Sequence, residues 1–191
     1  MVVSRGKYRG LKLKSLEGIN TRPTLAKVKE AIFSMLNNHC YDAQVLDLFA
    51  GSGSLGIEAL SCEASQVRFN DNSYEAISVI KENLAKLKCE NYLITKSTYQ
   101  EVLKNEPKEE YDLIFLDPPY HLKIINELIE KIIINELLAK NGIIVCECSL
   151  DEDIMSEFRD LFKYKEKKYG KTKITMFRRE ENENSNLPGN F

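Results

Sequence analysis

The chain has 191 residues, of which 43% are hydrophobic and 29% charged. This length and composition suit one globular domain with a full hydrophobic core. The formal net charge of -2 argues neither for nor against a nucleic-acid partner. No apolar run is long enough to span a membrane, and the five cysteines form no CxxC pair. We therefore expect a cytoplasmic protein with no metal site and no disulfide scaffold.

The beginning of the chain is locally basic. Gly6 and Gly10 permit turns, and Leu11 and Leu13 alternate with lysines, which predicts a short β-hairpin. Five basic residues precede the first acidic one: Arg5, Lys7, Arg9, Lys12 and Lys14. They are either a solvated hairpin face or an arm that meets phosphate, and the charge pattern alone leaves both open. After Arg22 and Pro23, Thr24 is a plausible N-cap for an amphipathic helix.

Strands and helices alternate from residue 45 onward. Strands are predicted at 45–49, 67–70, 92–95, 111–116 and 143–146, with two closing β-segments at 162–169 and 172–178. Helices are predicted from the glycine loop to residue 60, through 77–87, over 124–138 with Gly142 as its stop, and over 154–161. This order predicts a doubly wound α/β fold with a mostly parallel sheet. We expect residues 1–179 to form one domain, with 1–37 as an N-terminal extension and 180–191 as a disordered tail.

A glycine-rich loop follows the first strand. Gly51, Gly53 and Gly56 satisfy G-x-G-x-x-G, and Asp71 follows about twenty residues later, as in dinucleotide-binding loops. Asp47 favours a different ligand, because a carboxylate here repels a pyrophosphate but complements the sulfonium and ammonium of S-adenosylmethionine. Asp71 is suited to accept both ribose hydroxyls. Simpler roles are loop capping by Asp47 and capping by Asp71 of the helix that begins near Ser73.

The most specific signal is Asp117-Pro118-Pro119-Tyr120, at the end of the predicted fourth strand. Two prolines stiffen the turn, so Asp117 and the Pro118 carbonyl become fixed acceptors for an NH2 group. Tyr120 offers a face on which a base can stack. An exocyclic base amino group is a poor nucleophile, and accepting its hydrogens localises the lone pair. The tetrapeptide therefore predicts methyl transfer to a flipped-out or unpaired base.

Four segments together resemble one family closely: RGKYRGLKL at 5–13, TRPTLAKVKEAIFSML at 21–36, LDLFAGSGSLGIEALS at 46–61 and FLDPPY at 115–120. The family is the bacterial small-subunit ribosomal RNA guanine-N2-methyltransferases (RsmD-like), and the resemblance extends to about residue 178. It implies a Rossmann-like class I methyltransferase sheet of seven strands with S-adenosylmethionine as cofactor. It also implies methylation of N2 of one guanine in 16S ribosomal RNA, on an assembling 30S particle. We expect the enzyme to be a monomer.

The resemblance assigns roles by position. The guanine would be held and activated by Asp117, Pro118, Pro119 and Tyr120. The cofactor would contact Asp47, Phe49, Gly51, Gly53, Asp71, Asn72 and Thr98. The RNA would contact Arg5, Lys7, Arg9, Arg22 and Thr24. The sequence departs from the family pattern at three places: Asp71 replaces a usual Glu, Ser97 or Thr98 replaces an acid at the adenine, and Lys29 replaces a common Arg.

Other functions stay open at this point. A DNA or RNA adenine-N6 or cytosine-N4 methyltransferase uses the same acceptor logic, but the DNA enzymes need a recognition domain for which this chain has no length. Protein glutamine methyltransferases typically carry Asn where Asp117 stands. An NAD-binding oxidoreductase would favour an apolar residue at position 47 and a later acid–base pair. A non-catalytic RNA-binding module would not need Asp117 or the intact glycine loop.

Overall fold

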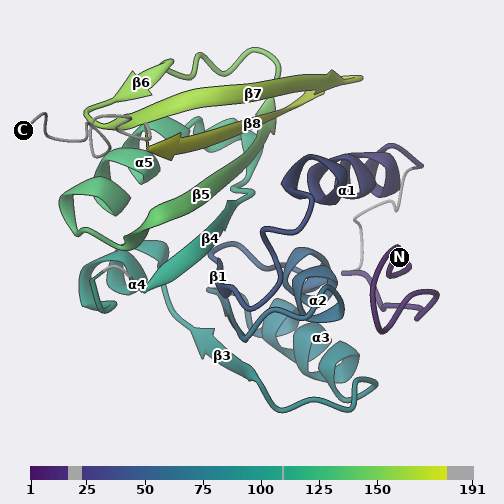
Figure 1. Ribbon diagram of the computed structural model, residues 1–191. Helices are drawn as coiled ribbons and strands as arrows, with labels where there is room; N and C mark the ends of the chain where they lie inside the picture. Colours follow the sequence, from purple (N-terminus) through teal and green to yellow (C-terminus); the bar gives the residue numbers. More distant parts are fainter. Residues whose placement is uncertain (17–22, 109, 180–191) are drawn as a thin grey trace, which may run out of the picture.

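The computed structural model describes residues 1–16, 23–108 and 110–179 (Figure 1). Its helices are α1 (Pro23–Leu36), α2 (Ser54–Ser61), α3 (Tyr74–Leu84), α4 (Tyr99–Asn105) and α5 (Ile125–Ile134), with a 3-10 turn at Tyr120–Leu122. Its strands are β1 (Gln44–Asp47), β2 (Gln66–Asp71), β3 (Tyr92–Lys96), β4 (Tyr111–Leu116), β5 (Leu138–Ser149), β6 (Glu157–Phe158), β7 (Leu161–Tyr169) and β8 (Thr172–Arg179).

All the strands belong to one sheet, in the order β3-β2-β1-β4-β5-β8-β7-β6. Strands β1 to β5 run parallel, whereas β6, β7 and β8 join by antiparallel pairing. The predicted α/β class and mostly parallel sheet are thus confirmed. The sheet has eight strands rather than the expected seven, because the two-residue strand β6 adds an edge beside β7.

Helices cover both faces of the sheet (Figure 1). Buried side chains of α1, α2 and α3 pack with one face, and those of α4 and α5 pack with the other. Consecutive residues of a strand point to opposite faces, so Leu113 and Phe115 of β4 join the first core cluster while Ile114 and Leu116 join the second. No helix within the described ranges is long and apolar enough to cross a membrane.

The predicted helix over 124–138 is too long. Helix α5 ends at Ile134, and Glu136 turns the chain with φ 56° before Leu138 opens β5. Leu137 and Leu138 are fully buried, so they continue an apolar run that resembles more helix. Leu138 pairs with Tyr111 of β4 instead, and Gly142 lies inside β5 rather than stopping a helix.

The predicted helix over 154–161 is also wrong. Ile154, Phe158 and Leu161 have helical spacing and are all buried, which explains the prediction. In the structure, Phe158 and Leu161 face each other across the β6–β7 hairpin, with Arg159 at φ 55° in the turn. Helix α1 begins at Pro23, two residues before the start that an N-cap at Thr24 implies, so Thr24 is not its N-cap.

The N-terminal arm, defined here as residues 1–16, folds back on itself as expected. Val2 and Lys12 form an antiparallel bridge, and Val3 and Leu13 are buried in the core beside α1 and α2. The arm is also fastened by Glu58 of α2, which is fully buried. The Glu58 carboxylate accepts the backbone N–H groups of Ser4 at 2.8 Å and Arg5 at 2.7 Å. A polar network therefore holds the arm in one place.

Lys29 completes this network. It stands where the resembled family commonly has arginine. Its ammonium group forms an ion pair with Glu58, and the two side chains are 4% and 0% exposed. The same ammonium donates to the Val2 carbonyl at 2.7 Å. Lys29 of α1 thus joins the arm to α2. Burying two charges is favourable only when they are paired and hydrogen-bonded, and both conditions are met here.

Candidate active site

A cavity of about 610 Å³ opens at the carboxyl edge of the parallel sheet. Residues at or beyond the carboxyl ends of all five parallel strands line it: 48, 49 and 51 after β1, 70–72 at the end of β2, 97–100 after β3, 117–120 and 122 after β4, and Glu147 near the end of β5. The carboxyl edge of a doubly wound sheet is where such folds bind ligands. The volume is within the range of small-molecule and cofactor sites.

The glycine loop forms one wall of the cavity. Gly53 caps α2 in the left-handed region, with φ 78°, a conformation that a side chain disfavours. Asp71 closes the loop from β2: one oxygen accepts the Gly51 N–H and the other accepts the Ser73 N–H, each at 2.9 Å. The N-cap of α3 is Ser73, whose hydroxyl accepts the Ala76 N–H, so the predicted capping of this helix by Asp71 is wrong. Each carboxylate oxygen of Asp71 can accept a further hydrogen bond, so Asp71 can hold the loop and still receive two ribose hydroxyls.

Asp47 lies behind the loop rather than in the cavity wall. It is 2% exposed, and its carboxylate accepts the Gly56 N–H of α2 at 2.9 Å. Burial raises the pKa of Asp47 to about 7, opposed by the Gly56 hydrogen bond and reinforced by the charge of Asp71. The structure therefore shows the loop-capping role. A direct cofactor contact of Asp47 stays a prediction, and the same holds for Gly53, which also lies outside the lining.

The residues present fit S-adenosylmethionine. The side-chain carbonyl of Asn70 is buried at the cavity without a hydrogen-bond partner among the described residues. It is an acceptor that a donor on a bound ligand would satisfy. Phe49 and Tyr99 provide apolar surface, with ring centroids 5.6 Å apart. Thr98 caps α4 in a capping box with Glu101, and this structural task for Thr98 was not foreseen.

The Asp117-Pro118-Pro119-Tyr120 turn forms the opposite wall. Asp117 is partly exposed to the cavity, Pro118 is buried, and Pro119 precedes the 3-10 turn that Tyr120 opens. The Tyr120 hydroxyl donates to Glu147 at 2.9 Å and lies 3.2 Å from the Thr172 hydroxyl. These contacts with β5 and β8 fix the orientation of the ring, so Tyr120 is a rigid face for stacking.

Two carboxyl groups lie side by side at this wall. Burial raises the pKa of Asp117 well above its usual range, and the nearby carboxyls of Glu147 and Asp47 raise it further. Burial also raises the pKa of Glu147, opposed by its hydrogen bond from Tyr120. Within the described ranges no cluster of His, Cys, Asp and Glu could hold a metal ion. The cavity thus favours a cationic or N–H-donating ligand.

The structure brings most of the predicted site residues together. Those that line the cavity are Phe49, Gly51, Asp71, Asn72, Thr98, Asp117, Pro118, Pro119 and Tyr120. Sequence reasoning missed the roles of Asn70, Tyr99, Gln100, Leu122 and Glu147. The sequence did contain a signal for the orientation of Glu147. It stands between Cys146 and Cys148 in a predicted strand, where alternate residues share one face, so it must point to the face opposite the two cysteines.

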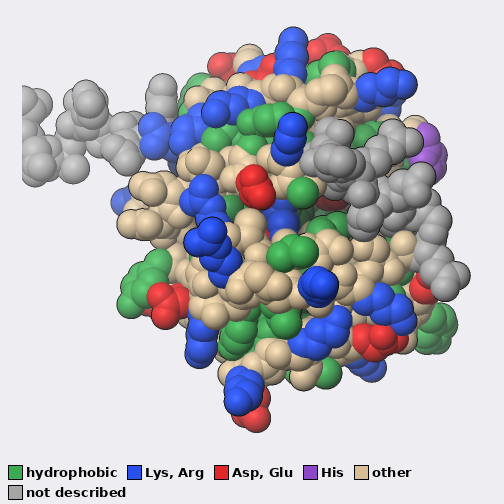
Figure 2. All heavy atoms as spheres, turned by 90° about the vertical axis from the view of Figure 1, so that its right-hand side faces the viewer, with side chains coloured by type: hydrophobic (Ala, Val, Ile, Leu, Met, Phe, Trp, Pro, Cys, Tyr) green, Lys and Arg blue, Asp and Glu red, His purple; other side chains and the backbone are tan. Residues whose placement is uncertain are grey.

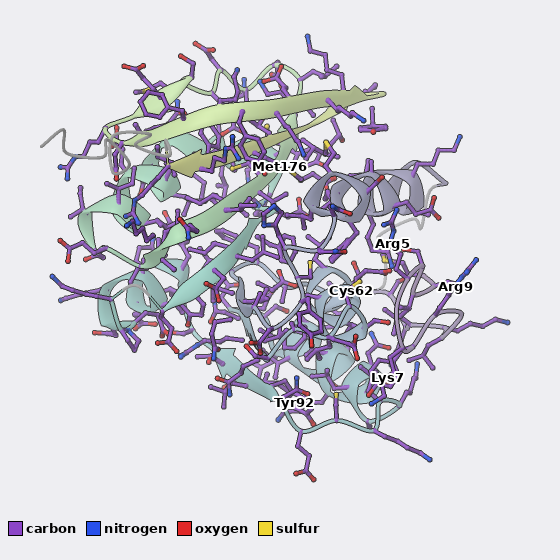
Figure 3. The ribbon with its side chains drawn as sticks, viewed as in Figure 1. Arg5, Lys7, Arg9, Cys62, Tyr92 and Met176 are labelled. Carbon is purple, nitrogen blue, oxygen red and sulfur yellow. The ribbon has the colours of Figure 1, made fainter. Side chains whose placement is uncertain are left out.

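The predicted RNA-contacting residues lie outside the cavity. Arg5, Lys7 and Arg9 are exposed on the N-terminal arm, at the edge of the molecule (Figure 3). Arg22 lies outside the described residues, and Thr24 is in the first turn of α1. Figure 2 views this side of the protein, where Lys and Arg side chains outnumber Asp and Glu. The face therefore has the charge that a polyanion requires.

Comparison with known proteins decides the family. The family described as "Conserved hypothetical protein 95" matches residues 1–178. The putative rRNA methyltransferase YlbH of Bacillus subtilis is 35% identical over 182 residues, covering 94% of this chain and 99% of that protein. Ribosomal RNA small subunit methyltransferase D of Escherichia coli K12 is 30% identical over 175 residues, covering 92% and 88%. This chain belongs to the RsmD-like family of S-adenosylmethionine-dependent methyltransferases.

A solved structure agrees with this assignment. A putative methyltransferase, yhhF, from Escherichia coli superimposes with a TM-score of 0.85 at 30% identity, covering 94% of this chain and 98% of that one. The RsmD-like resemblance inferred from the four sequence segments is confirmed. Membership in this family excludes the NAD-binding oxidoreductase that the G-x-G-x-x-G pattern had left open.

Proposed function

We propose that this RsmD-like enzyme methylates the exocyclic N2 amino group of a guanine in small-subunit ribosomal RNA. One observation carries the proposal: a proline-stiffened carboxylate, Asp117, faces a ligand-sized cavity at the carboxyl edge of the sheet. The names of relatives support ribosomal RNA as the substrate, because several are ribosomal RNA small subunit methyltransferases. Such a substrate places the enzyme in the cytoplasm.

The residues divide the cavity into two parts. Phe49, Gly51, Asp71, Asn72 and Thr98 would hold the cofactor, with Asp47 and Gly53 shaping the loop beneath it. When bound, S-adenosylmethionine supplies an electrophilic methyl group on a positively charged sulfur. The target base occupies the other part, against Tyr120. We also propose that the enzyme acts as a monomer.

Asp117 has two tasks in the proposed reaction. Its carboxylate and the Pro118 carbonyl accept the two N–H groups of the amino group, which aims the nitrogen lone pair away from them. The nitrogen must lose one proton when it is methylated, and Asp117 is positioned to take it. A raised pKa makes the ionised carboxylate a better proton acceptor, and the pKa of Asp117 is raised by burial and by Glu147.

The substrate RNA would lie across the basic face. We propose that Arg5, Lys7 and Arg9 of the arm contact phosphates, together with Arg22 and Thr24 near the start of α1. The firm attachment of the arm through Glu58 and Lys29 supports this role, because an ordered arm loses less conformational entropy when RNA binds. An assembling 30S particle presents folded RNA that such a surface can recognise by shape.

The test is methylation of small-subunit particles with labelled S-adenosylmethionine, using particles from cells that lack this gene. We expect label in N2-methylguanosine, identified by its mass, and no label with the Asp117→Asn variant. That variant keeps the side-chain volume, so its affinity for S-adenosylhomocysteine should stay close to that of the wild type. Label in N6-methyladenosine or N4-methylcytidine would contradict the choice of base, and a fully active variant would contradict the role of Asp117.

A further inference from the structure

Glu147 holds a position that the proposed mechanism does not use. Strands β4 and β5 are parallel, and Leu116 pairs with Cys146, so Asp117 and Glu147 are the next residues in register at the carboxyl edge. Neighbouring strands lie about 4.8 Å apart, and residues in register point to the same face. Both residues line the cavity. Two carboxyl groups therefore project side by side towards the same ligand.

The fold itself does not require an acid at this position. Glu147 is 7% exposed, and its one hydrogen bond among the described residues comes from the Tyr120 hydroxyl, to a single oxygen. No ion pair reaches it within the described ranges, and the carboxyl group of Asp117 lies nearby. A buried carboxylate without a cation is destabilising. Such groups are typically retained where a ligand completes their bonding.

The hydrogen-bond pattern of guanine matches this pair of acids. Guanine presents the N2 amino group directly beside N1–H, so it offers donors to two adjacent acceptors. Adenine and cytosine each present an amino group beside a ring nitrogen that is itself an acceptor, and a carboxylate repels such a nitrogen. A polar site of this kind rejects a mismatched partner strongly, since a buried acceptor is then left unpaired.

We propose that Glu147 is the residue that selects guanine, by accepting N1–H through its free carboxylate oxygen while Asp117 and the Pro118 carbonyl hold the N2 amino group. This inference rests on the proposed function, because it needs an amino group at Asp117. It deepens that function by naming the residue that distinguishes guanine from the other amino-bearing bases. The bond from Tyr120 leaves the other oxygen of Glu147 available for the base.

The test compares two bases at the methylated position, once that position has been located by mass spectrometry. The RNA carries either guanine or 2-aminopurine there. 2-Aminopurine keeps the N2 amino group but has an acceptor at N1. For the wild type we expect kcat/KM to favour guanine by a factor on the order of a hundred or more. The Glu147→Gln variant should lose most of its rate on guanine and reduce this preference at least tenfold, since its amide can donate to N1 of 2-aminopurine.

Two further variants separate selection from positioning. Tyr120→Phe removes the hydroxyl bonded to Glu147, and we expect it to slow both substrates by similar factors. Glu147→Asp keeps an acceptor on a shorter side chain, so it should slow catalysis and keep the preference for guanine. Affinity for S-adenosylhomocysteine reports whether each variant retains an intact cofactor site.

The outcomes distinguish this inference from the proposed function. An unchanged preference in Glu147→Gln would overturn the inference while leaving guanine methylation in place. A preference that collapses equally in Tyr120→Phe would also overturn it, because Glu147 would then act only through the tyrosine. A wild-type enzyme that methylates no guanine would overturn the proposed function first, and the inference with it.

Discussion

The Glu58→Gln substitution should weaken the protein chiefly by leaving the charge of Lys29 buried without its partner. The two side chains are 0% and 4% exposed, and the remaining bond from Lys29 to the Val2 carbonyl carries no opposite charge. Breaking one partner of a buried ion pair typically costs about 3–5 kcal/mol. The amide oxygen of glutamine can still accept the N–H groups of Ser4 and Arg5, so we expect about 3 kcal/mol.

The assay is urea denaturation of the single variants Glu58→Gln and Lys29→Met and of the double variant. Since the double variant contains no unpaired charge, it should be less destabilised than the sum of the singles, by on the order of 2 kcal/mol. The amides of Ser4 and Arg5, which donate to Glu58, should exchange their hydrogens faster in Glu58→Gln. A loss below about 1 kcal/mol, with additive singles, would refute the reasoning.

Three further predictions follow from the same structure. The stability of the cofactor-free wild type should fall, relative to Asp47→Asn, as pH rises from about 4 to about 7: the pKa of Asp47 is raised to about 7, so the folded state retains a proton that the unfolded state has released. Urea titrations across this range should show that the free energy of unfolding of the wild type falls by at most about 4 kcal/mol relative to the variant. Parallel curves of stability against pH for the two proteins would contradict this prediction. Gly6→Ala should destabilise more than Gly10→Ala, because both have positive φ but only at Gly6 would a Cβ meet the Ser61 carbonyl, at 1.8 Å; equal melting temperatures would speak against this packing of the arm. Replacing Arg5, Lys7 and Arg9 with serine should reduce the slope of log K against log salt for RNA binding by about 2. Replacing Lys104 and Lys140 with serine is the control and should leave this slope unchanged. Equal slopes for the wild type and both variants would exclude phosphate contacts by the arm.

Local patterns predicted most of the sheet and the position of the site. Strands β4 and β5 contain long buried apolar runs, which makes them recognisable in the sequence. The glycine loop and the Asp117 turn directly follow β1 and β4. Helices were predicted wrongly where buried apolar residues have helical spacing but belong to a different structure. Ile154, Phe158 and Leu161 imitate a helix because a tight hairpin buries them together. Helix α4 was not predicted because it buries only Val102 and Leu103 and so has little apolar periodicity. The capping box of Thr98 and Glu101 was a signal for its start that the prediction did not use.

Other features depend on contacts between distant segments, which no local pattern contains. Glu58 looked like one more helical residue, yet it meets Ser4 and Arg5 more than fifty positions away. Lys29 seemed a weaker substitute for arginine, and its burial with Glu58 gives it a structural reason to be there. The pairing of Asp117 with Glu147 needs the register between β4 and β5, which only the assembled sheet fixes.

The central claim is that Asp117 directs methylation of one guanine in small-subunit ribosomal RNA. The most direct measurement is mass mapping of that RNA from cells lacking this gene, complemented with either the wild-type chain or Asp117→Asn. We predict that one N2-methylguanosine is absent without the gene, returns with the wild-type chain and stays absent with the variant. An unchanged set of methylated nucleosides in the gene-deleted cells, or full restoration by Asp117→Asn, would contradict the account.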